Sequence, residues 1–178
     1  MTPRARPRLR DLTSADSSRV HEITAATGVF REEELEIAAE VFRDCVAAPG
    51  PSGGGVGAGV GAELQLRPYY ALGAELENRL VGWICWGQTP CTEGTWDLYW
   101  MAVDPAAQGA GVGSALVLEM ERRLTGRARL VSVDTSGRAD YGPTRAFYEA
   151  VGYRAVARVP DFYAPGDDQV IFTKALPE

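Results

Sequence analysis

The stretch Trp100–Leu116, WMAVDPAAQGAGVGSAL, decides how the rest of the chain is organised. It starts inside an apolar run, residues 98–103, that is rich in strand-forming side chains. Asp104-Pro105 ends that run, because proline fixes φ and has no amide hydrogen to donate to a sheet. Three glycines then alternate with small residues, at Gly109, Gly111 and Gly113. The stretch therefore predicts a strand, a glycine-rich turn and the start of a helix.

The helix after the glycines is predicted to begin at an anion site. Its apolar side chains recur every four residues, at Val112, Leu116, Met120 and Leu124. The first turn of a helix leaves N–H groups without partners, and the helix dipole is positive at that end. Glycines before it let a ligand approach these amides closely. We therefore expect a site for a negatively charged group, best suited to phosphate.

Length and composition favour one globular domain over residues 1–178, with 46% hydrophobic and 24% charged residues. The net charge of −6 argues against nucleic acid or an anionic membrane as partner, because phosphate contacts need clustered Lys and Arg. No apolar run is long enough to span a membrane, and the basic N-terminus lacks the apolar segment of a secretory signal. Three cysteines and one histidine argue against a zinc site and a disulfide framework. We expect no metal and a cytoplasmic location.

Patterns along the chain predict a mixed α/β fold. Strands are expected at 8–12, 63–75, 79–88, 95–103, 129–135, 153–159 and 169–174, and helices at a segment ending near Gly28, 31–48, 111–124 and 143–151. Strand 129–135 follows a crossover helix, so it should lie parallel to strand 95–103. Pro49–Ala62 is glycine-rich with no strand leading in and no helix leading out, so we predict a flexible loop. Asp161–Asp168 is expected to be the loop between the last two strands.

Two motifs resemble the GCN5-related N-acetyltransferase (GNAT) family. Val103-Asp104-Pro105 followed by Gln108–Gly113 is similar to its pyrophosphate loop, [Arg/Gln]-x-x-Gly-x-[Gly/Ala] after a strand that ends in Val-x-Pro. Phe147–Tyr153 is similar to its F-Y-x-x-x-G-F/Y segment, in the same order along the chain. The resemblance spans nearly the whole chain. It implies a mixed, mostly antiparallel central sheet, splayed between strands 4 and 5, with helices on both faces.

The resemblance also implies acetyl-CoA as cosubstrate, without a metal. The pantetheine arm is expected along the backbone of Met101, Ala102 and Val103. The pyrophosphate is expected on the amides of Gln108, Gly109, Ala110, Gly111, Val112, Gly113 and Ser114. An amide near residues 101–103 can also stabilise the oxyanion that develops on the acetyl group.

Tyr148 occupies the family's general-acid position, and a phenol with a pKa near 10 can protonate a leaving thiolate. Asp134 ends the strand that leads to that helix, and some relatives use a carboxylate there as general base. Asp134 can equally cap the following turn, and Asp97 on the preceding strand competes for the role of base. Many relatives carry asparagine seven residues before the catalytic tyrosine, where this chain has Tyr141.

The acceptor is expected to be the primary amine of a small molecule, although a peptide acceptor stays open. Asp168 and Tyr163 in the acidic, aromatic stretch 161–168, together with Asp97, are the expected substrate-binding residues. Carboxylates pair with an ammonium group, and aromatic faces attract it. Asp167 is assigned to the turn itself. Exposed sheet edges leave association into a homodimer open.

Two other functions stay open from the sequence. The first is a non-catalytic acyl-CoA-binding or sensor domain on the same fold, because a fold does not imply an activity. The second is a dinucleotide-binding enzyme, since Gly109-x-Gly111-x-Gly113 and Asp134 imitate its fingerprint. Residues 104–108, however, separate the strand from the glycines. The rest of the sequence is also too short for the second half of a dinucleotide-binding fold.

Overall fold

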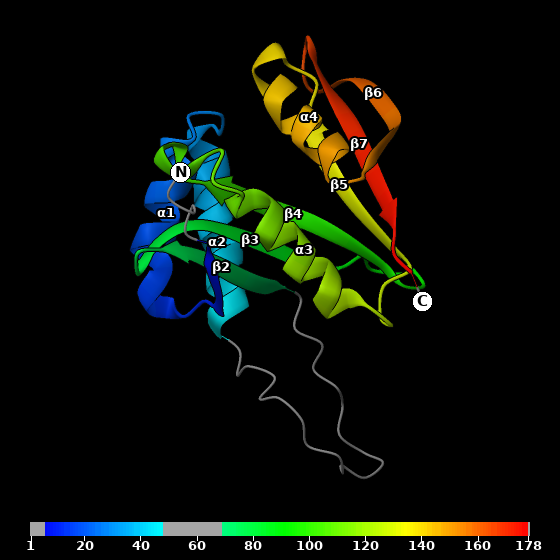
Figure 1. Cartoon of the computed structure of the whole chain (residues 1–178). Coiled ribbons are helices and arrows are strands. Elements are labelled where there is room, and N and C mark those ends of the chain that lie inside the picture. The colour runs from blue at the N-terminus through cyan, green and yellow to red at the C-terminus, as the bar shows by residue number, and fades with distance from the viewer. Residues whose placement is uncertain (1–5, 48–68, 178) are drawn as a thin grey trace, which may run out of the picture.

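The computed structural model describes residues 6–47 and 69–177. One seven-stranded sheet runs through them in the order β1-β2-β3-β4-β5-β7-β6 (Figure 1). Its strands are β1 (Arg8–Asp11), β2 (Tyr70–Leu76), β3 (Arg79–Gln88), β4 (Thr95–Val103), β5 (Leu130–Ser136), β6 (Arg154–Ala164) and β7 (Asp167–Ala175). The predicted glycine-rich loop 49–62 and the first part of the predicted strand 63–75 lie outside the described residues.

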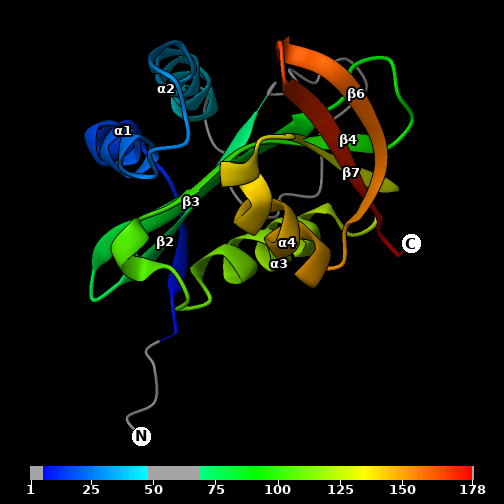
Figure 2. The same cartoon turned by 90° about the horizontal axis from the view of Figure 1, so that it is seen from above.

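Helices cover both faces of the sheet (Figure 2). They are α1 (Ser17–Ala26), α2 (Glu32–Ala47), α3 (Val112–Leu124) and α4 (Gly142–Ala150), with 3₁₀ turns η1 (Ser14–Asp16), η2 (Pro105–Ala107) and η3 (Ala139–Tyr141). The helices α1 and α2 lie on one face of β2 and β3, α3 lies on the other face, and α4 packs against β6 at the far end of the sheet. Within the described residues, no helix is both long and apolar enough to cross a membrane.

Each face has its own apolar core, which is why both layers of helices are needed. Under α1 and α2, the fully buried Trp83 ring meets the Phe42 ring edge-on at 5.8 Å, and the Trp83 indole donates to Thr24 Oγ1 at 2.9 Å. Under α3 and α4, Leu116 and Met120 are wholly buried in the larger cluster. Full burial of one such apolar side chain contributes about 1.5–3 kcal/mol.

All neighbouring strands are antiparallel except β4 and β5, which are parallel. This pair is joined through α3, so the predicted crossover is confirmed. The mostly antiparallel order differs from the parallel, doubly wound sheet of dinucleotide-binding folds, so the chain lacks the fold on which that alternative depends.

The strands β4 and β5 diverge after a short paired stretch. They pair only over Thr95–Leu98 and Leu130–Val133. Beyond that point, β4 continues to Val103 and β5 continues to Ser136, but the two strands no longer pair with each other. Figure 1 shows them separating. The predicted splay between the fourth and fifth strands is confirmed. It leaves one backbone edge of each strand open toward the other.

The last hairpin corrects one expectation. Residues 161–168 were expected to form a loop, but β6 extends to Ala164, β7 starts at Asp167, and these two residues pair. Pro165-Gly166 alone makes the turn, with Gly166 at φ +81°. The aromatic residues in the stretch favour a strand, and pairing with β7 outweighs the turn-forming residues around them.

Candidate active site

The glycine-rich segment between β4 and α3 is fastened at its start. One oxygen of Asp104 accepts a hydrogen bond from the Ala106 N–H at 3.0 Å, and the other pairs with Arg19 of α1. The helical bonds begin with Ala115 N–H donating to the Gly111 carbonyl at 3.0 Å. The N–H groups of residues 112–114 precede this bond, so they point out of the helix end. This helix end therefore has the form of an anion site.

The three glycines of this segment are explained by different structural constraints. Gly109 and Gly111 have φ of +74° and +79°, a region that side chains of L-residues rarely adopt. Gly113 is helical, but a Cβ on it would lie 3.2 Å from the Phe147 ring of α4. Gly113 thus allows close packing of α3 against α4, whereas Gly109 and Gly111 set the path of the turn.

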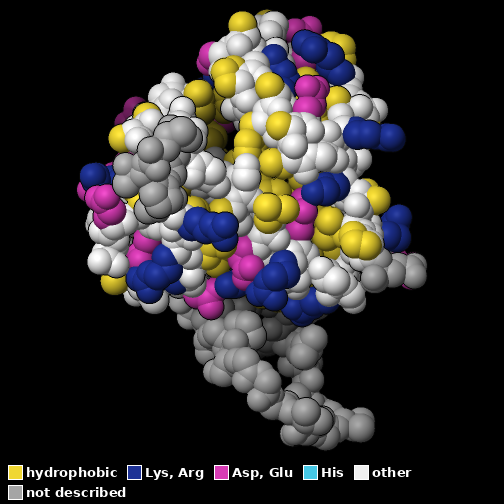
Figure 3. Space-filling model, in the orientation of Figure 1, with side chains coloured by type: hydrophobic (Ala, Val, Ile, Leu, Met, Phe, Trp, Pro, Cys, Tyr) yellow, Lys and Arg dark blue, Asp and Glu magenta, His cyan; other side chains and the backbone are white. Residues whose placement is uncertain are grey.

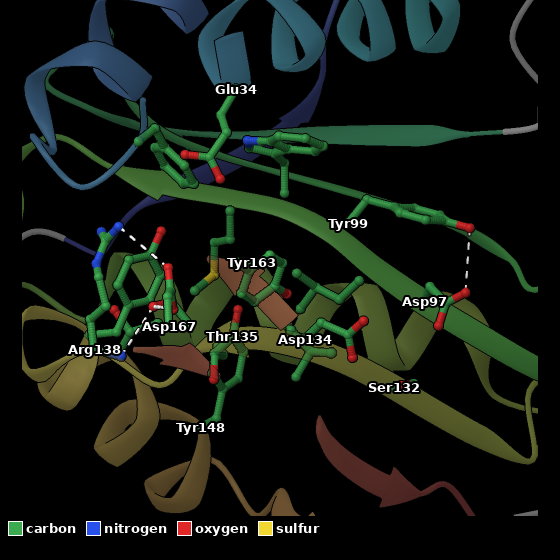
Figure 4. Close-up of a pocket in the computed structure, with 18 of the residues that line it drawn as sticks. Glu34, Asp97, Tyr99, Ser132, Asp134, Thr135, Arg138, Tyr148, Tyr163 and Asp167 are labelled. Carbon is green, nitrogen blue, oxygen red and sulfur yellow. Dashed lines mark hydrogen bonds and ion pairs between the residues drawn. The ribbon is translucent and has the colours of Figure 1, made fainter. Parts of the chain in front are cut away.

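A cavity of about 320 Å³ opens where β4 and β5 separate. Its wall is formed by the end of β4, the end of β5, the α1–α2 connection, α4 and the β6–β7 hairpin (Figure 4). Figure 3 shows hydrophobic side chains along the hollow between the two diverging halves of the sheet. Met101 lies in the wall, and residues 101–103 pair with β3 on one side only. The other backbone edge of these residues faces the opening.

Tyr148 on α4 points into this cavity from a tightly packed position. It is 4% exposed, and its ring lies against the rings of Phe147, Tyr153 and Phe172 at centroid distances of 5.3, 5.7 and 6.1 Å. Burial raises the pKa of the Tyr148 phenol well above its ordinary value of 10. The phenol therefore keeps its proton at neutral pH.

Asp134 and Asp97 lie toward one end of the cavity (Figure 4). Asp134 accepts a hydrogen bond from Gln169 Nε2 at 2.7 Å, and Asp97 accepts one from Thr89 Oγ1 at 2.7 Å. Burial, assisted by the negative charge of Asp97, raises the pKa of Asp134, while the Gln169 bond opposes that rise. A raised pKa makes Asp134 a stronger base than an ordinary surface carboxylate.

The opposite end of the cavity holds a buried ion-pair cluster that the sequence did not indicate. Asp167, 4% exposed, accepts from Ser136 Oγ and from Arg31 at 3.2 Å, and Arg138 lies 3.6 Å from it. Arg138 also donates to the Val29 carbonyl at 3.2 Å. The cluster thereby ties the α1–α2 connection to the end of β5.

Of the predicted substrate-binding residues, Asp97 and Tyr163 lie in the cavity wall and Asp168 does not. Asp168 pairs with Arg158 and accepts the Asp161 N–H at 2.9 Å, contacts that lower its pKa. Desolvation, the largest cause, raises the pKa of Tyr163 to about 12. The structure thus brings Tyr163 and Asp97 into the wall with Tyr148, Asp134 and Met101, and holds Asp168 in a surface ion pair.

Sequence reasoning also missed Glu34, which lies in the cavity wall at the start of α2. Three consecutive glutamates at a helix start are typical of a solvated first turn that complements the dipole. The bond from Arg31 N–H to Glu34 Oε2, at 2.7 Å, turns that side chain back over the α1–α2 connection. Only the glutamate half of a capping box is present, because Arg31 stands where a Ser, Thr, Asp or Asn would complete the sequence signal.

The chain is similar to known acetyltransferases. The sequence pattern of the acetyltransferase (GNAT) domain family matches residues 67–155. Blasticidin-S acetyltransferase from Streptomyces morookaense is 34% identical over 115 residues, which cover 64% of this chain and 77% of that protein. A GNAT-family protein from Desulfovibrio desulfuricans has a crystal structure with a TM-score of 0.80 and 34% identity, covering 97% of this chain and 100% of the other.

A structure from Salmonella typhimurium that contains acetyl-CoA has the same fold. Its TM-score is 0.66 at 15% identity, and the match covers 97% of this chain and 95% of that one.

Proposed function

Because the chain belongs to the GNAT family of acetyltransferases, we propose that it transfers the acetyl group of acetyl-CoA to a primary amine of a small molecule. The observation that carries this proposal is the open edge of β4. That edge leads through the glycine-rich segment to the first-turn amides of α3, and it faces a cavity that contains Tyr148. A phosphate-bearing ligand with an extended arm fits both parts at once.

The residues at the splay suit acetyl-CoA. The backbone of Met101, Ala102 and Val103 can pair with the pantetheine arm as an added strand would, since β5 has left that edge. The N–H groups of Val112, Gly113 and Ser114 point out of the α3 end and can receive the pyrophosphate. Acetyl-CoA supplies the thioester. A backbone amide at the open edge can donate to the acetyl oxygen as it gains negative charge.

The chemistry then needs one base and one acid. The amine nitrogen forms a bond to the acetyl carbon, and its surplus proton passes to Asp134, directly or through water. The carbon–sulfur bond breaks, and Tyr148 gives its proton to the departing thiolate. A phenol held neutral by burial and a carboxylate with a raised pKa are matched to these tasks.

The proposal is tested with labelled acetyl-CoA and a panel of primary amines, with N-acetylated product identified by mass spectrometry. We expect product from at least one amine, and CoA released in equal amount. Binding of acetyl-CoA without any acetylated amine contradicts the proposal and favours the acyl-CoA sensor. Release of CoA without product indicates hydrolysis, which also contradicts it.

A further inference from the structure

We propose that the acceptor carries a second positive charge and that Asp97 selects for it. The inference rests on the proposed function and goes beyond it in naming the class of acceptor, a diamine. It follows from how charge is distributed in the cavity wall.

At one end of the cavity, the basic side chains already form ion pairs. Arg31 and Arg138 are the basic side chains in its wall within the described part of the chain. Both are directed to the buried Asp167, at 3.2 and 3.6 Å, and Arg138 also pairs with Asp140 at 3.1 Å. Glu34 in the same wall accepts the backbone N–H of Arg31, so a substrate that enters this end meets arginines that already have acidic partners.

The other end is left negative. Among residues 6–47 and 69–177, Asp97 accepts from the hydroxyls of Thr89 and Tyr99 and Asp134 from the amide of Gln169, and all three donors are neutral. Asp97 is half-buried and Asp134 is more exposed, whereas the half-buried Asp104 and the buried Asp167 each have an arginine partner. Two carboxylates left without a cation in a partly enclosed space favour a ligand that brings one.

The two carboxylates are spaced for separate roles. Asp97 pairs in register with Ser132, and Asp134 follows two residues later on the same face of β5. Two strand residues correspond to about 6.6 Å along β5, and neighbouring strands lie about 4.8 Å apart, so the Cα atoms of Asp97 and Asp134 are separated by roughly 8 Å. A reacting amine at Asp134 therefore places a second ammonium group at Asp97 when a short chain separates the two nitrogens.

The surroundings of Asp97 hold it in place and add attraction for a cation. The Thr89 hydroxyl bond fixes one carboxylate oxygen and leaves the other available. The Tyr99 ring, 38% exposed, stands beside it and is supported edge-on by Tyr69 at 5.2 Å. An aromatic face next to a carboxylate attracts an ammonium group more strongly than a carboxylate alone.

The test compares matched acceptors: 1,3-diaminopropane, 1,4-diaminobutane and 1,5-diaminopentane against the amino alcohols of equal length. We expect kcat/KM to be at least about tenfold higher for the best diamine than for its amino alcohol, the scale of one hydrogen-bonded charge pair. Asp97→Asn should remove this preference, so that the ratio of the diamine kcat/KM to the amino alcohol kcat/KM falls to about one. Asp44→Asn, the same charge change on the exposed side of α2, is the matched control and should keep the preference.

Salt provides a readout on the unaltered protein. Raising the ionic strength should reduce the diamine preference, because it rests on charge. Acetylation of both series with equal kcat/KM, or a preference that survives Asp97→Asn, overturns this inference and leaves the proposed function standing. Acetylation of no amine in the broad panel overturns the proposed function, and this inference with it.

Discussion

Replacing Gly111 by alanine separates the binding role of the glycine-rich segment from its folding role. Gly111 caps α3 at φ +79°, and a Cβ there would meet nothing within 4 Å. The cost is therefore conformational and not steric. The left-handed conformation costs alanine about 1–2 kcal/mol, and the stiffer unfolded chain returns about 0.4–1 kcal/mol. We expect a net loss of about 1 kcal/mol and a fall in Tm of about 2–4 °C.

The chain supplies a matched control for this change. Gly126, just after α3, has φ +72° and likewise open space around a Cβ, so Gly126→Ala should cost the same stability. It lies at the opposite end of α3, about 20 Å from the glycine-rich segment at 1.5 Å per residue. Its N–H is not part of the proposed phosphate site.

Calorimetric titration with CoA distinguishes the two variants. A methyl group at position 111 occupies the space through which the phosphate approaches the following amides, and each hydrogen bond to a charged group contributes about 1.5–3 kcal/mol. The Kd for CoA should therefore rise about ten- to hundredfold in Gly111→Ala and stay unchanged in Gly126→Ala. An equal Kd in both variants refutes the assignment of this helix end to the pyrophosphate.

Three further predictions concern single side chains. Tyr148→Phe keeps the ring packing and should lower kcat about 10²–10⁴-fold with CoA affinity unchanged, as followed by thiol release. Gln169→Met removes a bond that lowers the pKa of Asp134, so the ratio of variant to wild-type kcat/KM should fall as pH decreases; a flat ratio argues against Asp134 as base. Arg10 lowers the pKa of Asp16 from 3.8 to about 2, so this stabilisation is complete above the unfolded pKa and lost as pH falls from about 4 to about 2. Asp16→Asn should cost about 1 kcal/mol at neutral pH in urea unfolding, and the difference from wild type should vanish near pH 2.

Local sequence signals were enough for most elements of the sheet. The bounds predicted for β3 and β4 agree with the structure, because each is an apolar run closed by turn-forming residues. Glu77 and Asn78, which make the turn before β3, have φ of 51° and 62°. Such turns depend on the backbone preferences of the residues that form them, so the sequence alone can predict them.

The last hairpin shows where local signals fail. Its residues 161–168 contain aspartates, proline and glycine, which favour a loop when considered alone. Asp161 does adopt φ 51°, and the register of β6 with β7 is irregular between Val159 and Ala164. The strand continues on the far side of this irregularity, because pairing with β7 is a tertiary contact that no local pattern contains.

The residues of the candidate site also fall into two groups: those that sequence patterns predict, and those that only the tertiary structure brings to the cavity. Tyr148 and Asp134 were predicted from short motifs, and both lie in the cavity wall. Asp167 was assigned to a turn and Glu34 was not singled out, and both enter the wall only because the α1–α2 connection folds over β5 and β7. Asp167 and Asp168 are adjacent in the sequence, yet β-strand alternation sends one inward and the other to Arg158 at the surface.

A structure of the protein with CoA bound tests the central claim most directly. The account predicts the pantetheine arm along Met101–Val103 in the opening between β4 and β5, with the pyrophosphate on the first-turn amides of α3. The sulfur should lie within hydrogen-bonding reach of the Tyr148 hydroxyl. CoA bound elsewhere on the surface, or a thiol turned away from Tyr148 with the splay filled by another segment of the chain, contradicts it.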